Sequence, residues 1–459
     1  MKAFRFLLLI ALCACLPAEA QKLTGDWQGQ LDAGRASLRI VLHFTHENGV
    51  YKGTMDSPDQ GALGVPMEQV LLKDKDVSLS VPSAQLKFAG TLQSDSILTG
   101  SIMQRQAVIP ITLKRIDWKK LRPQTPCEPF PYQTEEVVIK NPKDGVSLAG
   151  TLTLPQGKKR CRAVILLTGS GAQDRDESLF NHKPFWVIAD YLTRHGFAVL
   201  RCDDRGVGQS TGDANLATTA TGASDAEAMI DYLKTRREIN PKKIGLLGHS
   251  EGGPIAFITA ATRKEVDFVI SMAGPGVKGD SVMLKQNLDM MRLEGYPEQK
   301  IESFRKLWKE IYAVAETDLP DEEVLNQVVN IYEKHLYPTR PMSEGEREQI
   351  RRQMTTFTAP WIRFFLRYDP QTDLKKLKCH IMAINGNKDS QVDATTNLEA
   401  IRTATAPLKG RQVNIKLYPE LNHLFQHCQT GLFTEYESIK ETISPEVLED
   451  ITVWLEGLK

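Results

Sequence analysis

Residues 243–262, KIGLLGHSEGGPIAFITAAT, decide the fold of this chain. The run 244–247 is apolar and typical of a short buried strand, whereas 254–261 is apolar, rich in alanine and compatible with a helix. Between them lies the turn 248–252, GHSEG. A Gly-x-Ser-x-Gly turn between a strand and a helix predicts a nucleophilic serine, because the turn holds the hydroxyl above the sheet and glycine leaves room for the backbone. Ser250 is therefore the candidate nucleophile.

A second copy of the pattern, GQSTG at residues 208–212, lacks this context. A polar spacer separates it from a predicted strand at 197–201, and residues 213–221 are small and polar without a helical period. We interpret this copy as a loop and its Ser210 as a structural serine.

The composition is that of an ordinary globular protein with room for two to three domains. Of the 459 residues, 41% are hydrophobic and 25% are charged, and the formal net charge is zero. This balance gives no indication of a nucleic-acid partner.

The first twenty residues are typical of a secretory signal. Lys2 and Arg5 precede an apolar core, and Ala18-Glu19-Ala20 forms a cleavage pattern. We expect an exported protein, periplasmic or extracellular, with lipidation of Cys15 as the alternative. No later stretch is long and apolar enough for an integral membrane segment after signal removal.

The remaining cysteines and the histidines predict neither a disulfide framework nor a metal site. An odd, scattered set in a chain of this size is not a disulfide framework, although one bridge remains possible, and no C-x-x-C spacing is present. His43 and His46 lack a neighbouring set of carboxylates in the sequence. We expect no metal and no cofactor. The five cysteines are Cys127, Cys161, Cys202, Cys379 and Cys428.

Changes in hydrophobic periodicity and proline content divide the chain into domains. Residues 21–118 alternate in period two between turn signals, which predicts a small all-β sandwich or barrel, with Trp27 in its core. Four prolines make 119–133 a stiff linker. From 134 to 459, β-strands alternate with helices, which predicts an α/β domain with a mostly parallel sheet.

A long segment interrupts that alternation, at about residues 277–378. It is rich in charge, aromatics and helical spacing, so we expect a helical lid insertion rather than a structureless loop. Most of its aromatics should form its own core, and others remain candidates for an acyl or leaving-group pocket. Earlier in the domain, Ser224 and Glu227 have the spacing of a capping box and predict the start of a helix.

Three predicted strands end at residues that acyl transfer requires. Ser250 follows the first, Asp389 follows the strand 381–385, and His423 follows the strand 413–417. His423 would take the serine proton and return it to the leaving group, and Asp389 would orient and stabilise the imidazole.

The oxyanion of such a reaction needs two preset amide donors. We expect the amide of Glu251, at the start of the helix, to be one. The other should follow the strand 162–168, and Ser170 and Gly171 remain equal candidates.

Other residues compete for these roles. Asp393 could replace Asp389 but resembles a helix cap, and His427 could join His423 on a metal but lacks a third ligand. His249 flanks the serine and is expected to point elsewhere. The charged loops 174–177 and 203–206 are expected to form local salt bridges rather than substrate contacts.

These motifs together resemble the α/β-hydrolase superfamily. They are GHSEGG at 248–253, DRGVGQS at 204–210, residues 386–392 and Asn422-His423, and the TGSG at 168–171 is similar to a loop of exported bacterial carboxylesterases. The branch resembles bacterial esterases related to serine aminopeptidase and prolyl-peptidase-type hydrolases. The resemblance implies an α/β-hydrolase fold and a serine hydrolase acting on small-molecule carboxylic esters. A peptidase of the same fold and a non-catalytic surface- or carbohydrate-binding protein are the alternatives.

Overall fold

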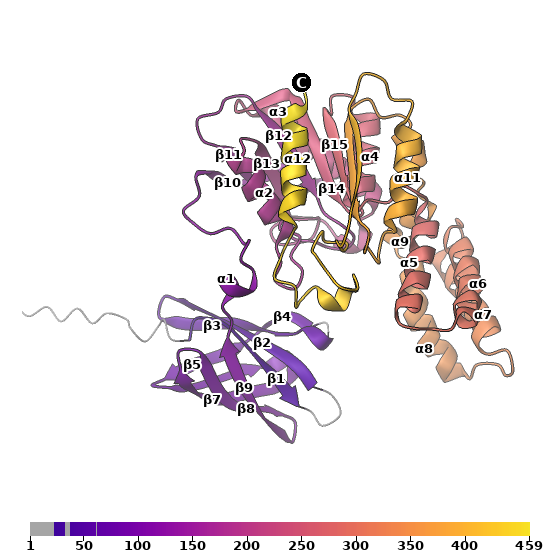
Figure 1. Ribbon diagram of the computed structural model, residues 1–459. Helices are drawn as coiled ribbons and strands as arrows, with labels where there is room; N and C mark the ends of the chain where they lie inside the picture. Colours follow the sequence, from indigo (N-terminus) through magenta and orange to yellow (C-terminus); the bar gives the residue numbers. More distant parts are fainter. Residues whose placement is uncertain (1–22, 33–36, 61) are drawn as a thin grey trace, which may run out of the picture. The chain divides into compact units, whose positions relative to one another are not determined.

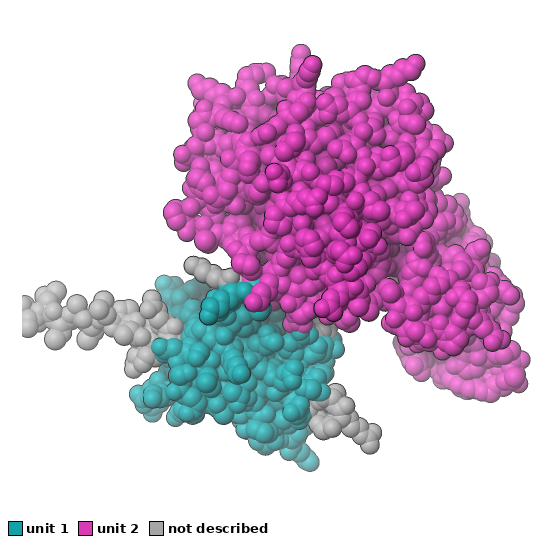
Figure 2. All heavy atoms as spheres, in the orientation of Figure 1, with its two compact units in different colours: residues 1–121 teal, residues 122–459 magenta. Residues whose placement is uncertain are grey.

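A computed structural model describes residues 23–32, 37–60 and 62–459, and divides the chain into two compact units, 1–121 and 122–459 (Figure 2). The predicted signal at 1–20, with Cys15, lies outside the described residues. Among the residues described, no helix combines the length and the hydropathy needed to cross a membrane.

The described part of the first unit is a single antiparallel sheet of nine strands, in the order β4-β3-β2-β1-β9-β8-β7-β6-β5 (Figure 1). The ends of the sheet meet where β3 lies beside β5, so the sheet is nearly closed around a core that includes Trp27, Phe44 and Phe88. The predicted all-β domain is confirmed, as a barrel-like sheet rather than a two-sheet sandwich. The strands are β1 (Gly25–Asp32), β2 (Ser37–Glu47), β3 (Val50–Ser57), β4 (Ala62–Pro66), β5 (Glu68–Lys73), β6 (Asp76–Val81), β7 (Leu86–Ser94), β8 (Ile97–Gln104) and β9 (Ala107–Arg115).

His43 in this sheet has carboxylate neighbours that the sequence interpretation missed. Its ring nitrogens lie 2.7 Å from Asp26 and 2.9 Å from Asp56, on the strands to either side. Burial alone would lower the pKa of His43, but the two carboxylates raise it to about 9. Strand pairing brings these residues together, because Asp26 lies directly opposite His43 in the register of β1 and β2.

The second unit, all of which is described, is built on an eight-stranded sheet in the order β10-β11-β13-β12-β14-β15-β16-β17. The strands from β13 to β17 run parallel and the β10–β11 hairpin is antiparallel, so the predicted mostly parallel sheet is confirmed. The strands are β10 (Tyr132–Asn141), β11 (Val146–Pro155), β12 (Cys161–Leu167), β13 (Ala198–Cys202), β14 (Ile239–His249), β15 (Phe268–Met272), β16 (His380–Gly386) and β17 (Val413–Tyr418).

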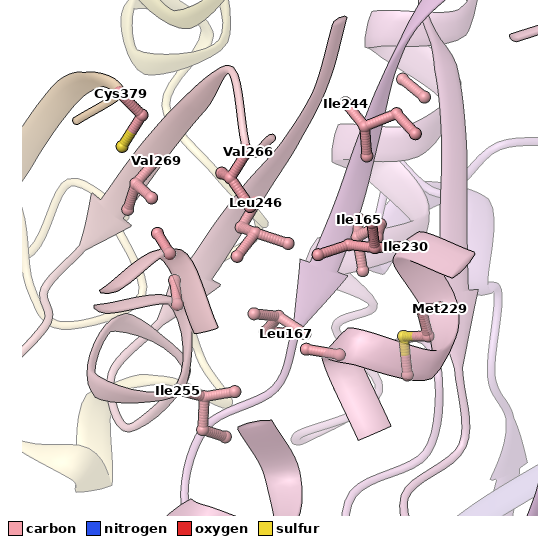
Figure 3. Close-up of a cluster of buried hydrophobic side chains, with 14 of the residues drawn as sticks. Ile165, Leu167, Met229, Ile230, Ile244, Leu246, Ile255, Val266, Val269 and Cys379 are labelled. Atoms are coloured by element: carbon pink, nitrogen blue, oxygen red, sulfur yellow. The ribbon is translucent and has the colours of Figure 1, made fainter. Parts of the chain in front are cut away.

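Helices cover both faces of this sheet, which is why its central strands β12, β15 and β16 contain continuous apolar runs. On one face α3 (Thr219–Thr235), α4 (Gly252–Thr262) and α11 (Ala394–Thr405) pack over a cluster that includes Ile165, Leu246 and Ile230 (Figure 3). On the other face α2 (Pro184–Arg194) and α12 (Pro445–Gly457) cover a second cluster.

The capping prediction for α3 is wrong. The helix begins at Thr219, where Thr218 and Thr221 form a reciprocal capping box, and Ser224 lies inside it. Ser224 instead accepts a hydrogen bond from Asn141 at 3.0 Å in the buried interior.

The predicted helical insertion is confirmed between β15 and β16. Its core includes Leu307, Tyr312 and Phe357 from its own helices, and α6 to α8 lie away from the sheet (Figure 1). The helices are α5 (Gly279–Leu293), α6 (Glu298–Ala315), α7 (Asp321–Leu336), α8 (Glu344–Met354), α9 (Pro360–Arg367) and α10 (Gln371–Leu374).

The proline-rich segment that follows α1 (Trp118–Leu121) is fastened to the second unit at its first residue. Arg122 is 1% exposed and donates to the carbonyls of Phe180, Glu437 and Ile439 at 2.8–3.0 Å. A buried guanidinium is stabilised by such carbonyl acceptors. Arg122 therefore joins the loop of Phe180 to the loop of Glu437 and Ile439, which lie far apart in the sequence.

Candidate active site

The turn between β14 and α4 forces Ser250 into a left-handed conformation, with φ at 52°. Its amide is held by the carbonyl of Met272 at 2.8 Å. The flanking glycines are required by close packing, because a Cβ on Gly248 would lie 1.9 Å from the carbonyl oxygen of Gly252, and one on Gly252 would lie 2.1 Å from that of Leu167. A strained serine between two such glycines has the form of a nucleophile elbow.

Asp389 and His423 are brought together by the loops that follow β16 and β17. The Oδ2 atom of Asp389 lies 2.7 Å from Nδ1 of His423, and the two side chains are 0% and 4% exposed. The other oxygen of Asp389 accepts the amides of Gln391 and Val392, each at 2.8 Å. A carboxylate fixed in this way holds the imidazole in one orientation, with Nε2 left to exchange a proton.

The Ser250 side chain stands opposite the loop after β12, since a Cβ built on Gly169 would lie 3.3 Å from its Cβ. Within the part of the chain that the structure describes, its hydroxyl forms no hydrogen bond. The bond to a catalytic base often forms only when substrate is bound.

Among the described residues, the amides of Glu251, Ser170 and Gly171 donate no hydrogen bond, whereas the amide of Gly169 is occupied by Glu177 at 2.8 Å. The three unengaged amides are those that the sequence assigned to the oxyanion, and the structure does not separate Ser170 from Gly171. The turn of Ser250 and the start of α4 also point the positive end of a helix at this position.

His249 points away from the serine, as expected, but it occupies a position that the sequence did not indicate. Its Nδ1 lies 3.0 Å from the Glu177 carboxylate, and its Nε2 lies 3.0 Å from the backbone carbonyl of His423. Its ring is 4.8 Å from that of His423. His249 and Glu177 thus connect the loop of Gly169 to the loop of His423 through the buried interior.

Glu251 carries a buried carboxylate between two elements. Thr219 of α3 donates to one oxygen at 2.6 Å, and the indole of Trp361 of α9 donates to the other at 2.7 Å. Burial raises the pKa of Glu251. The residue after the serine is thereby joined to the helical insertion, a contact that no local sequence signal predicts.

The charged loops form the ion pairs expected of them. Arg175 contacts Asp203 at 2.8 Å, and Arg205 contacts Asp225 at 2.5 Å. Asp204 accepts instead from Thr168 and the amide of Gln173, and burial raises its pKa to about 7.

The competing candidates have other structural roles. Ser210 is buried in its loop, where it donates to the carbonyl of Asp203 and accepts the amide of Ala149. Asp393 caps α11 by accepting the amide of Thr396.

His427 points to solvent and pairs with Glu441 at 2.8 Å, away from His423. No cluster of three or more histidine, cysteine, aspartate or glutamate side chains with metal-binding geometry occurs in the described ranges.

A cavity of about 470 Å³ lies against the candidate oxyanion amides. None of Ser250, Asp389 and His423 lines it. Its walls come from the loop after β12, the loop after β13, the start of α3, the start of α4 and the insertion. They include Ser170, Gly171, Ala172, Asp204, Arg205, Ala214, Ala217, Asp225, Glu251, Ile255, Ala359 and Trp361.

Known proteins are similar to this chain over part of its length. Esterase EstD of Thermotoga maritima is 26% identical over 334 residues, which cover 72% of this chain and 68% of EstD. The uncharacterised protein PA2218 of Pseudomonas aeruginosa is 26% identical over 38% of this chain and 45% of its own length. Among solved structures, the Pyrococcus furiosus esterase Pf2001 aligns with 71% of this chain and 91% of its own, with a TM-score of 0.43 and 16% identity.

A protein-family model also matches this chain. The model of the family described as X-Pro dipeptidyl-peptidase (S15) matches residues 144–416, more than half of the chain, and spans the elbow at Ser250 and Asp389. The expected α/β architecture, a mostly parallel sheet with helices on both faces, is confirmed. With its strand-turn-helix elbow and a family match of this extent, the chain belongs to the X-Pro dipeptidyl-peptidase (S15) family.

Proposed function

We propose that this hydrolase is a serine esterase, which cleaves carboxylic esters through Ser250, His423 and Asp389. The observation that carries the proposal is the 2.7 Å contact between Asp389 and the buried ring of His423. That ring packs against His249, the residue that precedes Ser250 on the elbow. The similarity to esterase EstD supports an ester as the substrate.

In the proposed reaction, His423 removes the Ser250 proton as the serine oxygen attacks the ester carbonyl. The carbonyl oxygen becomes an oxyanion, which the amide of Glu251 and that of Ser170 or Gly171 stabilise. One such donor is worth about 3–4 kcal/mol. The C–O bond of the ester then breaks, the alcohol takes the proton from His423, and an acyl-serine remains. Water, activated by His423, hydrolyses the acyl-serine and restores the serine.

Hydrolysis of p-nitrophenyl acyl esters from C2 to C12 tests this proposal. We expect Ser250→Ala to lower kcat by at least about 10⁴-fold, because no other group supplies the attacking oxygen. Ser210→Ala is the matched control, since it removes the serine of the second Gly-x-Ser-x-Gly copy and should leave kcat nearly unchanged. Full activity in Ser250→Ala would disprove the assignment of the nucleophile.

A peptidase of the same fold is tested in the same experiment with X-Pro p-nitroanilides, the substrate type that the family description suggests. We expect the esters to be cleaved with the higher kcat/KM. Faster turnover of the amides, abolished by Ser250→Ala, would retain the nucleophile and replace the ester with a peptide bond as the substrate.

A further inference from the structure

We propose that the 470 Å³ cavity binds the acyl group of the ester, that this group is uncharged, and that Trp361 sets its maximum length. This inference rests on the proposed function. Four observations on the walls of the cavity carry it.

The cavity lies against the amides proposed to hold the reacting carbonyl oxygen, although Ser250 itself does not line it. Ser170, Gly171 and Glu251, whose amides are unengaged among the described residues, all line it. Gly169 also lines it and faces the Cβ of Ser250. Its volume lies within the range of about 300–1,000 Å³ that is usual for small-molecule sites.

The side on which the cavity lies assigns it to the acyl group rather than the alcohol. A histidine that acts as general acid must lie beside the leaving oxygen, so the alcohol leaves on the side of His423. Since neither His423 nor Asp389 lines the cavity, the part of the ester that it accepts is the one that stays on Ser250.

The chemistry of the walls favours an uncharged acyl group. Alanine, Ile255 and Trp361 supply apolar surface, as an aliphatic or aromatic chain requires. The carboxylates of Asp204, Asp225 and Glu251 face a single guanidinium, Arg205, which is already paired with Asp225. A carboxylate on the acyl chain would therefore lose its water and find no unpaired cation among the lining residues.

Trp361 is a fixed wall of the cavity and not a freely rotating one. Its indole nitrogen is held by Glu251 at 2.7 Å, and its ring stacks on Phe365 with centroids 5.3 Å apart. A large side chain held at both its polar and its apolar edge limits the length of any chain that grows toward it.

Two variants of Trp361 separate its bulk from its hydrogen bond. Trp361→Ala removes both the bulk and the hydrogen bond, whereas Trp361→Phe removes only the hydrogen bond. Both variants leave Glu251 without the indole donor, so a difference between them reports the bulk of the side chain alone. With the p-nitrophenyl series, we expect Trp361→Ala to raise kcat/KM for C10–C12 relative to C4 by about tenfold or more. Trp361→Phe should keep the wild-type chain-length preference. Ala217→Leu, which narrows the cavity, should shift the preference toward shorter chains.

A series of esters that differ in the alcohol tests whether the alcohol lies outside the cavity. A substrate with a charged acyl group tests whether the cavity excludes charge. For alkyl acetates of increasing alcohol length, Trp361→Ala should match Trp361→Phe. In the wild type, p-nitrophenyl hemisuccinate should be cleaved at least about tenfold more slowly than the butyrate.

The outcomes distinguish this inference from the proposed function. An unchanged acyl profile in Trp361→Ala, the same change in both Trp361 variants, or a change confined to the alkyl acetates would overturn the cavity assignment. So would a hemisuccinate cleaved as fast as the butyrate. Each of these leaves the esterase proposal intact if Ser250→Ala has abolished activity. Ester hydrolysis that persists in Ser250→Ala would instead overturn both the proposed esterase mechanism and the cavity assignment that rests on it.

Discussion

The hydrogen bonds of His249 fix its charge. Both groups that its ring nitrogens face, the Glu177 carboxylate and the His423 carbonyl, are acceptors, and the Glu177 oxygen already accepts the amide of Gly169. Both nitrogens must therefore donate, which makes the ring an imidazolium. Burial alone would lower the pKa of His249, but Glu177 and the His423 carbonyl raise it above its ordinary value. A buried charge pair thus holds the loop of His423, the proposed base, beside the loop that carries the candidate oxyanion donors.

We expect His249→Asn and His249→Gln each to lower kcat by about 10–100-fold, because displacement of a reacting group by about 1 Å has effects of this size. Asparagine keeps a donor near Glu177 and glutamine keeps one near the His423 carbonyl, so the pair shows which contact matters more. His195→Gln is the control, since His195 is exposed and its ring donates to the backbone carbonyl of Tyr191 at 2.7 Å. Variants with wild-type kcat would remove His249 from the positioning of the base.

The charge of His249 also predicts a pH dependence with a definite sign. Its folded pKa is raised, so the stabilisation is fully present below the unfolded value of about 6.5 and is lost as pH rises through the folded value. The thermal midpoint of the wild type should therefore fall on the alkaline side more steeply than that of His249→Gln. Parallel midpoints across the whole alkaline range would contradict this prediction.

Residues at strand ends could be predicted from the sequence, whereas contacts between distant loops could not. The positions of Ser250 and Asp389 follow from apolar runs, and that of His423 follows from the strand pattern at 413–417. The carboxyl ends of these parallel strands meet at one edge of the sheet. Glu177 belongs to a charged loop 72 residues before His249 and carries no signal that it enters the interior. Trp361 was one aromatic among several in the insertion, and its contact with Glu251 depends on how α9 packs.

At the scale of elements, the elbow depends on the approach of its own backbone. Gly248→Ala would place a Cβ 1.9 Å from the carbonyl oxygen of Gly252, so the turn must move. We expect a loss of about 1–3 kcal/mol or more and a lower thermal midpoint of the α/β domain. Gly457→Ala at the end of α12 is the control, because its Cβ would meet nothing within 4 Å. Equal midpoints for the two variants would contradict this account of the turn.

The start of α3 shows where sequence signals for an element fail. Residues 218–221 are small and polar and give no helical period, yet Thr218 and Thr221 cap each other there. The helix extends to Thr219 because its first turn packs on the elbow, where Thr219 meets Glu251. Tertiary contact therefore overrides a local pattern, Ser224 with Glu227, that would begin the helix nearly two turns later.

At the scale of the whole molecule, every residue proposed for catalysis and for the acyl cavity lies within the second unit. Arg122, the first residue of that unit, donates hydrogen bonds to two loops of the same unit. We therefore expect residues 119–459, produced without the β domain, to fold and to keep kcat/KM on p-nitrophenyl esters within about threefold. Circular dichroism and the ester assay check this, with Ser250→Ala in the same truncated chain as control. A folded but inactive fragment would show that the β domain contributes to the substrate site.

The place of the helical insertion has a consequence for how such enzymes diverge. The chain leaves the sheet after β15 and returns in β16, and the two strands are parallel neighbours, paired along the whole of β15. Descendants of one ancestor could exchange, lengthen or lose the intervening helices while the strands stay in register and the residues at their ends stay in place. Substrate range in this lineage would then evolve by replacement of the helical insertion. Trp361, which donates to Glu251, marks the place where a replaced insertion would contact the retained turn.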